Sequence, residues 1–276
     1  MKYISLLVLF FCVFNLSANI LMDDFDDGNR LLQDPPSSLA YYTSHESSSM
    51  READGMLTLG GGGGNNRILT AYFGKPGDYT ELKVGEAISL QLTFSAEIAE
   101  RKSGRHLRLG LFESGDQRGD RRAVNADGFR SDVPGHGYYR GYQVAMGFVK
   151  GGGQVAWIAK RALYGTDLLI LALGDASAYQ PMGSGGGKEF EEIKSGAIYT
   201  AQLNIERVSD REVKVSGILA AGDPQSAGET DYFYHTIDTD DPVFKFDTLA
   251  IGLNAADGSV SRLDMRSLRV FTVQNR

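Results

Sequence analysis

Five consecutive residues near the start of the chain, Asp23-Asp24-Phe25-Asp26-Asp27, include four carboxylates. Carboxylates this close repel one another, so water must solvate them or a hard cation must lie among their oxygens, and Ca²⁺ takes roughly six to eight oxygen ligands. Because alternate residues of a strand point to opposite faces, Phe25 on the core side places Asp24 and Asp26 together on the outer side. The pattern predicts either a calcium site that uses Asp24 and Asp26 or a solvated acidic segment.

A second group of residues has the chemistry to bind a saccharide. Aromatic rings suit the apolar C–H face of a sugar ring, and Arg, Gln or His beside them can bond its polar edge. The candidates are His106, Arg108, Tyr139, Arg140, Tyr142, Gln143 and Trp157. Every second residue from 107 to 111 is leucine, so burial of the leucines turns Arg108 to the opposite, open face. We predict that Arg108 and Tyr142 are exposed on that face, whereas Trp157 is either a ligand platform or part of the core.

Composition narrows the class of partner. Of the 276 residues, 42% are hydrophobic and 23% are charged, as in folded proteins. The 35 acidic and 28 basic residues give a net charge of −7 at pH 7. Phosphate-backbone binding depends on clustered cations, so no nucleic-acid partner is expected. The chain has 34 glycines against 7 prolines, which favours many turns between short strands.

Residues 1–18 have the layout of a secretory signal peptide. Lys2 supplies a positive charge, residues 4–14 are almost wholly apolar, and small residues follow. The apolar run is shorter than the about 20 residues of a spanning helix, and no second long run appears, so no membrane span is expected. The mature protein is predicted to begin near Asn19, to be secreted or periplasmic, and to lose Cys12, the only cysteine. Its stability then depends on a hydrophobic core rather than on disulfides.

Strand-like runs recur along the whole chain. Residues 88–94 and 107–111 alternate apolar and other residues with the period of a half-buried strand. The expected strands are 38–43, 55–59, 67–73, 87–96, 106–112, 138–149, 154–159, 168–173, 198–206, 212–218, 232–236, 249–253 and 261–273. No stretch has a convincing amphipathic helical period. The pattern predicts an all-β, antiparallel two-sheet sandwich formed by one domain over residues 19–276.

The two ends of the chain resemble secreted bacterial jelly-roll domains of the concanavalin A-like lectin and glucanase superfamily, LamG-like domains included. Residues 23–28 are similar to the D-x-F-x-D-G opening of these domains, residues 246–253 with 261–270 to their closing strands, and residues 199–207 to their penultimate hairpin arm. The resemblance implies a jelly roll whose first and last strands lie side by side and often hold a structural Ca²⁺. That would bring Asp264 to Asp24 and Asp26, although Met265 replaces the family's usual Asn or Asp.

The chain shows no catalytic signature. A retaining glucanase of this class carries E-x-D-x-x-E on a strand, and the run Glu189-Phe190-Glu191-Glu192 has the wrong spacing. A jelly-roll lyase needs Gln-x-His, whereas Gln143-Val144-Ala145 has no histidine. The four histidines lack zinc-site spacing. We therefore expect a lectin-like protein that binds extracellular oligo- or polysaccharide on its concave sheet. The alternative is a polysaccharide lyase or glycoside hydrolase with an unrecognised site on the same face.

Overall fold

The computed structural model describes residues 17–60, 67–75, 77–100, 104, 106–114, 125–129, 138–148, 156–161, 179–185, 192–222, 230–254 and 260–274. Within these ranges nearly all regular structure is β-strand, and the one helical element is a short 3-10 turn at Ser47–Ser49. No helix in these ranges is long and apolar enough to span a lipid bilayer.

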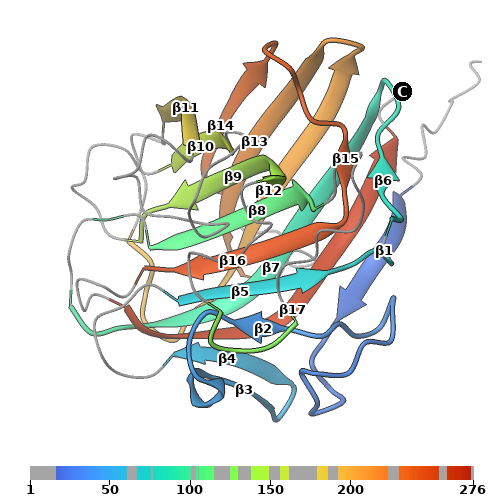
Figure 1. Cartoon of the computed structure of the whole chain (residues 1–276). Coiled ribbons are helices and arrows are strands. Elements are labelled where there is room, and N and C mark those ends of the chain that lie inside the picture. Colours follow the sequence, from blue (N-terminus) through green and yellow to red (C-terminus); the bar gives the residue numbers. More distant parts are fainter. Residues whose placement is uncertain are drawn as a thin grey trace, which may run out of the picture.

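Two large antiparallel sheets are stacked face to face (Figure 1). In the described residues the eight-stranded sheet has the order β14-β13-β12-β7-β17-β4-β3, with β1 also paired to β17. Its strands are β1 (Ser17–Asp23), β3 (Met50–Ala53), β4 (Met56–Gly60), β7 (Glu86–Ile98), β12 (Ile198–Ser209), β13 (Glu212–Ala221), β14 (Thr230–Asp238) and β17 (Val260–Gln274).

The seven-stranded sheet has the order β11-β10-β9-β8-β16-β5-β2. Its strands are β2 (Tyr42–Thr43), β5 (Arg67–Tyr72), β8 (Leu107–Glu113), β9 (Arg140–Met146), β10 (Ala156–Arg161), β11 (Tyr179–Gly185) and β16 (Thr248–Leu253). A small ribbon pairs β6 (Thr80–Glu81) with β15 (Lys245–Phe246).

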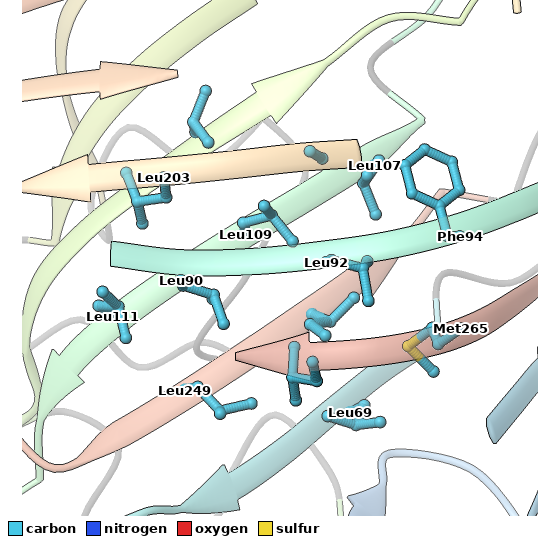
Figure 2. Close-up of a cluster of buried hydrophobic side chains, with 14 of the residues drawn as sticks. Leu69, Leu90, Leu92, Phe94, Leu107, Leu109, Leu111, Leu203, Leu249 and Met265 are labelled. Atoms are coloured by element: carbon cyan, nitrogen blue, oxygen red, sulfur yellow. The ribbon is translucent and has the colours of Figure 1, made fainter. Parts of the chain in front are cut away.

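The space between the sheets holds the main hydrophobic core. Leu107, Leu109 and Leu111 of β8 belong to the same buried cluster as the alternate apolar residues 90–94 of β7. Figure 2 shows these side chains together with Leu249 of β16. The period of two that the sequence displays therefore does point the leucines inward, and the predicted all-β, two-sheet jelly-roll sandwich is confirmed.

The first and last strands of the fold lie side by side, as the resemblance implied. β1 pairs antiparallel with β17, from Ser17 opposite Val273 to Asp23 opposite Leu268. The predicted signal peptide falls almost wholly outside the described residues, which begin at Ser17, and so does the expected strand at 168–173.

Strand β11 was not predicted because its sequence, YQPMGSG, contains proline and glycine and lacks β-branched residues. Proline is tolerated there because β11 is an edge strand. The glycines are needed because the Tyr234 side chain of β14 lies against them: a Cβ on Gly183 or on Gly185 would come within 2.2 Å of it. The contact brings together one edge of each sheet.

Truncation of a core leucine tests the assignment of the two faces of β8. We expect Leu109→Ala to destabilise the protein by about 2–5 kcal/mol, because it leaves a cavity in a fully buried position. Urea unfolding gives the free energy. The control is Ile237→Ala, at a side chain that is 54% exposed, where a change within about 0.5 kcal/mol is expected. Equal effects of the two substitutions would contradict the assignment.

Candidate functional site

The outer face of the seven-stranded sheet, which is turned away from the eight-stranded sheet, carries a second buried cluster. Its members are apolar and largely aromatic: Ile68, Tyr72, Phe112, Phe129, Tyr139, Ala145, Trp157, Ala159, Tyr179 and Ala250. Tyr42 of β2 is only partly buried and packs against this cluster. An antiparallel sheet commonly exposes one face to water. This sheet instead has aromatic side chains buried on its outer face.

Strand register arranges part of this outer face into a line of side chains that we call the central row. Directly opposite one another lie Thr70 of β5 and Ala250 of β16, then Ala250 and Gly110 of β8, then Gly110 and Gln143 of β9. Gln143 in turn lies opposite Ala159 of β10. The central row therefore has polar side chains at Thr70 and Gln143. The residues between these two, and Ala159 beyond Gln143, have little or no side chain.

Larger side chains flank the central row on both sides. On one side, Arg108 lies opposite Ala145, which lies opposite Trp157. On the other side, Tyr72 lies opposite Thr248, which lies opposite Phe112. Aromatic rings and a guanidinium group therefore border a strip of small residues.

Two polar side chains of the central row lack hydrogen-bond partners. Gln143 and Thr70 are fully buried. In the part of the chain that the structure describes, the amide nitrogen and oxygen of Gln143 and the hydroxyl of Thr70 have no hydrogen-bond partner. A buried polar group left unbonded costs about 1–3 kcal/mol, so each such group in a native protein calls for an explanation, of which a bound water or ion is one. Both groups come from strands whose other face is core, so folding leaves them nowhere else to point.

The outer face is not the open surface that the sequence suggested. Arg108 does project away from the core leucines, as predicted, but it is 2% exposed, and Trp157 is 5% exposed. The Tyr139 hydroxyl lies 2.9 Å from the Tyr72 hydroxyl. Alternation along β8 indicates which side a residue faces, whereas exposure depends on what packs over that side. The polar groups of this face are therefore covered rather than open to solvent.

Four of the predicted ligand residues share this face, namely Arg108, Tyr139, Gln143 and Trp157. Thr70 was missed, because a single threonine between apolar neighbours gives no functional signal in the sequence. Only the pairing of β5, β16, β8 and β9 places Thr70 in one row with Gln143.

Tyr142 points the other way, and the prediction that it shares an exposed face with Arg108 is wrong. It lies opposite Leu111 and is fully buried in the main core. Its hydroxyl donates to Asp238 Oδ2 at 2.6 Å and accepts from the Val243 backbone N–H at 2.9 Å. Lys160 Nζ lies 3.0 Å from the same carboxylate oxygen. Burial and the bond to Asp238 raise the pKa of Tyr142, so the group is a neutral structural donor.

His106 and Arg140 also lie away from the central row. His106 stacks on Phe148 with ring centroids 5.3 Å apart, and its Nδ1 accepts the Phe148 backbone N–H at 2.9 Å. Arg140 pairs with Asp241, with Nη2 2.7 Å from Oδ2, near the surface. Both residues hold chain segments in place at the ends of strands.

The predicted calcium site of Asp24, Asp26 and Asp264 is not formed. Asp24 and Asp26 are exposed, as expected, but β1 ends at Asp23 and these residues follow it in a turn. The Asp264 carboxylate accepts from the Thr58 hydroxyl at 2.8 Å and from Arg262 Nε at 2.9 Å. Over the described residues, no three or more His, Cys, Asp or Glu side chains gather where they could hold a metal ion.

The acidic segment instead stabilises the turn that follows β1. Asp23 is buried and accepts from the Phe25 backbone N–H at 2.8 Å, the Leu39 N–H at 3.3 Å and the Tyr41 hydroxyl at 2.8 Å. Burial raises the pKa of Asp23, and these bonds oppose the rise. They hold Phe25 at a positive φ of 59°, with its ring packed against Tyr41.

Glu52 of β3 forms a side-chain hydrogen bond with Asp27 of the acidic segment. Burial, followed by its hydrogen bond to Asp27 and the negative charge there, raises the pKa of Glu52 from 4.5 to about 8. The same bond lowers the pKa of Asp27. At neutral pH Glu52 is therefore the protonated donor and Asp27 the charged acceptor. The sequence does not indicate this pair, because the two residues are brought together only by the fold.

No protein-family model and no curated protein matches the chain. Among solved structures, the metal-free lectin I-B4 from Griffonia simplicifolia is similar, with 13% identity, a TM-score of 0.47, and coverage of 93% of this chain and 99% of that chain. The legume lectin-like domain from Entamoeba histolytica has 14% identity, a TM-score of 0.43, and coverage of 83% and 88%. The potassium-bound carbohydrate recognition domain of Emp46p has 13% identity, a TM-score of 0.46, and coverage of 83% and 87%. At such identities the likeness concerns the fold alone.

Substitution of Tyr142 separates its structural role from ligand binding. We expect Tyr142→Phe to destabilise the protein by about 1–3 kcal/mol, because the buried Val243 N–H loses its acceptor and Asp238 loses a donor. Urea unfolding measures the loss. Saccharide binding should stay at the wild-type level, since the ring faces the core. A variant of wild-type stability with weakened binding would contradict this placement.

The Glu52–Asp27 pair predicts a pH dependence of stability. Folded Glu52 holds its proton up to a pKa of about 8, whereas an unfolded glutamate releases it near 4.5. The stability that this group contributes is therefore complete below pH 4.5 and is lost as the pH rises through 8. We expect thermal melts to show that Glu52→Gln, which stays neutral, loses less stability than wild type between pH 5 and pH 9. Identical pH profiles would contradict the shifted pKa.

Proposed function

We propose that this chain is a secreted, lectin-like carbohydrate-binding protein that holds an oligo- or polysaccharide against the outer face of the seven-stranded sheet. The observation that carries the proposal is the Gln143 amide, which is buried in the central row with no partner in the described part of the chain. A ligand with hydroxyl groups supplies both the donor and the acceptor that this amide lacks.

The surroundings of Gln143 suit a sugar better than a purely apolar ligand. Its neighbours across the strands, Gly110 and Ala159, have little or no side chain. Trp157 and Phe112 lie in the flanking rows, and aromatic rings are the side chains that suit the apolar C–H face of a sugar. Few polar groups within an apolar, aromatic lining is the usual composition of a small-molecule site.

The signal-peptide pattern of residues 1–18 supports an extracellular or periplasmic location, in which a protein can meet polysaccharides. The net charge of −7 agrees with a neutral ligand rather than with a nucleic acid.

Gln143→Met tests the proposal because it keeps the side-chain volume and removes both polar atoms. We expect saccharide binding to fall by about tenfold or more, since one or two hydrogen bonds are lost. Stability should stay unchanged or rise, because an unbonded buried amide is replaced by an apolar group. A glycan array of the protein without residues 1–18, followed by calorimetry and urea unfolding, measures both quantities.

The matched control is Gln202→Met on β12, in the eight-stranded sheet. Gln202 Nε2 donates to Ser89 Oγ at 3.2 Å, so this variant should lose a little stability and keep full binding. The proposal is overturned if the wild-type protein binds no saccharide, or if Gln143→Met binds as wild type.

A further inference from the structure

Residues 125–129 form a short segment, which we call the strap, beside β2 at one edge of the seven-stranded sheet (Figure 1). The strap belongs to no strand, and within it only Phe129 is buried. The backbone of Thr43 in β2 bonds the strap twice. Its N–H donates to Asp127 Oδ1 at 3.1 Å, and its C=O accepts from the Gly128 N–H at 2.9 Å. The strap therefore covers the outer edge of β2, which would otherwise present unpaired backbone groups.

The strap also places one apolar side chain on the outer face of the sheet. Phe129 belongs to the buried cluster of that face, and the cluster members nearest to β2 in strand order are Ile68 and Tyr72 of β5. Tyr42 of β2 packs against the same cluster. Phe129 therefore extends from the edge of the sheet towards β5, the strand that carries the buried hydroxyl of Thr70.

A charged pair holds the strap to the segment that follows β1. Arg30 Nη1 donates to Asp127 Oδ1 at 3.1 Å and Arg30 Nη2 donates to Oδ2, the two-pronged geometry of a strong arginine–carboxylate pair. Arg30 is itself fixed by Tyr41, whose N–H donates to the Arg30 carbonyl at 2.7 Å and whose carbonyl accepts from Nη1 at 3.0 Å. Arg30 is therefore the fixed half of the pair, and Asp127 is the half that belongs to the strap.

We propose that the strap is a lid that opens and closes over the β5 side of the outer face, with the Arg30–Asp127 pair as its latch. Opening breaks no strand pairing, because the strand order of this sheet ends at β2. The carboxylate, the guanidinium and the backbone groups that separate exchange their hydrogen bonds for bonds to water. A segment with few buried apolar contacts opens at a lower free energy than the core strands do.

Such a lid gives a ligand a route to groups that are covered when it is closed. Thr70 and Gln143 are fully buried and Trp157 is 5% exposed, so a ligand can reach this face only when a covering segment moves. This role in access rests on the proposed function. The opening of the strap does not, and it can be measured without a ligand.

Thiol labelling measures the opening of the lid. Cys12→Ser removes the only cysteine of the chain, so Thr70→Cys then introduces a single thiol at a buried position of β5. Dithiobis(nitrobenzoic acid) can react with this thiol only in an open state, so the labelling rate under native conditions reports the opening equilibrium. We expect Asp127→Ala to raise that rate by about tenfold or more, because the charge-assisted hydrogen bonds of the latch are lost.

Gly128→Ala loosens the strap without removing a charge. Gly128 has a positive φ of 74°, which a residue with a Cβ adopts only under strain, and the nearest atom to that Cβ would be the His45 carbonyl oxygen at 4.0 Å. We expect this variant to raise the labelling rate by about fivefold or more, and it provides the test if Asp127→Ala does not fold. The matched control is Asp210→Ala, which removes the pair with Arg207 at the β12–β13 hairpin and should leave the rate unchanged.

A thiol in the other sheet distinguishes opening of the lid from loss of global stability. Thr93→Cys, in the same Cys12→Ser background, places it at a buried position of β7. Its labelling rate should respond to neither strap variant. The inference is overturned if both strap variants leave the labelling of Thr70→Cys unchanged, or if they accelerate the labelling of Thr70→Cys and Thr93→Cys equally.

The outcomes also separate the lid from the proposed function. If the glycan array finds no saccharide, the proposed function fails, and the labelling rates still decide whether the strap opens. For a saccharide that the array identifies, Asp127→Ala should raise the association rate by about tenfold or more, because a larger fraction of the protein is open. Faster labelling with an unchanged association rate would overturn the role of the lid in access.

Discussion

The central strands of the seven-stranded sheet are buried on both faces, and much of the remaining structure depends on that constraint. The residues of β8 from Leu107 to Phe112 are all buried, and so are all six residues of β10. In these central strands nearly every side chain is inside, and alternation decides only which of two interiors it enters. Leucine enters the core between the sheets, and Arg108 and Gln143 enter the outer cluster. The polar groups of the outer face are therefore held in place by the same pairing that builds the core.

The sequence was sufficient to predict the strands whose two faces differ in polarity. Residues 107–111 show leucine at every second position, and the structure turns those leucines inward. It was insufficient for β9, because aromatic or polar residues stand at both parities: Tyr142 belongs to one and Tyr139 and Gln143 to the other. The pairing of β9 with β8 places Tyr142 opposite Leu111 and so decides which face of the sheet Tyr142 joins. This register depends on residues that are far apart in the sequence. Exposure of Arg108 was overestimated for a different reason: alternation along β8 indicates the side that Arg108 faces, but not what packs over that side.

The fold places the four carboxylates of the acidic segment in different environments. Asp23 is buried and accepts three hydrogen bonds, and Asp24 and Asp26 remain in water. Asp27 accepts a hydrogen bond from protonated Glu52. Repulsion among the four carboxylates is thus relieved by solvation, by hydrogen bonds and by one retained proton. From the sequence pattern alone, a bound cation could also have relieved this repulsion. The neighbouring residues do not indicate that Tyr41 and Glu52 lie close to the acidic segment in the fold.

Unbonded polar groups are not in themselves a signature of binding, as Thr93 of the eight-stranded sheet illustrates. Its hydroxyl is as buried and as unpartnered within the described residues as that of Thr70. The difference lies in the neighbours. Thr93 lies between Thr200 and Ser267, two hydroxyl-bearing side chains. Thr70 shares its row with Ala250, Gly110 and Gln143 between aromatic flanks. The two unbonded groups of the outer face therefore lie among apolar and aromatic neighbours, whereas the unbonded hydroxyl of Thr93 lies among other hydroxyl groups, so the same lack of a partner arises in two different environments.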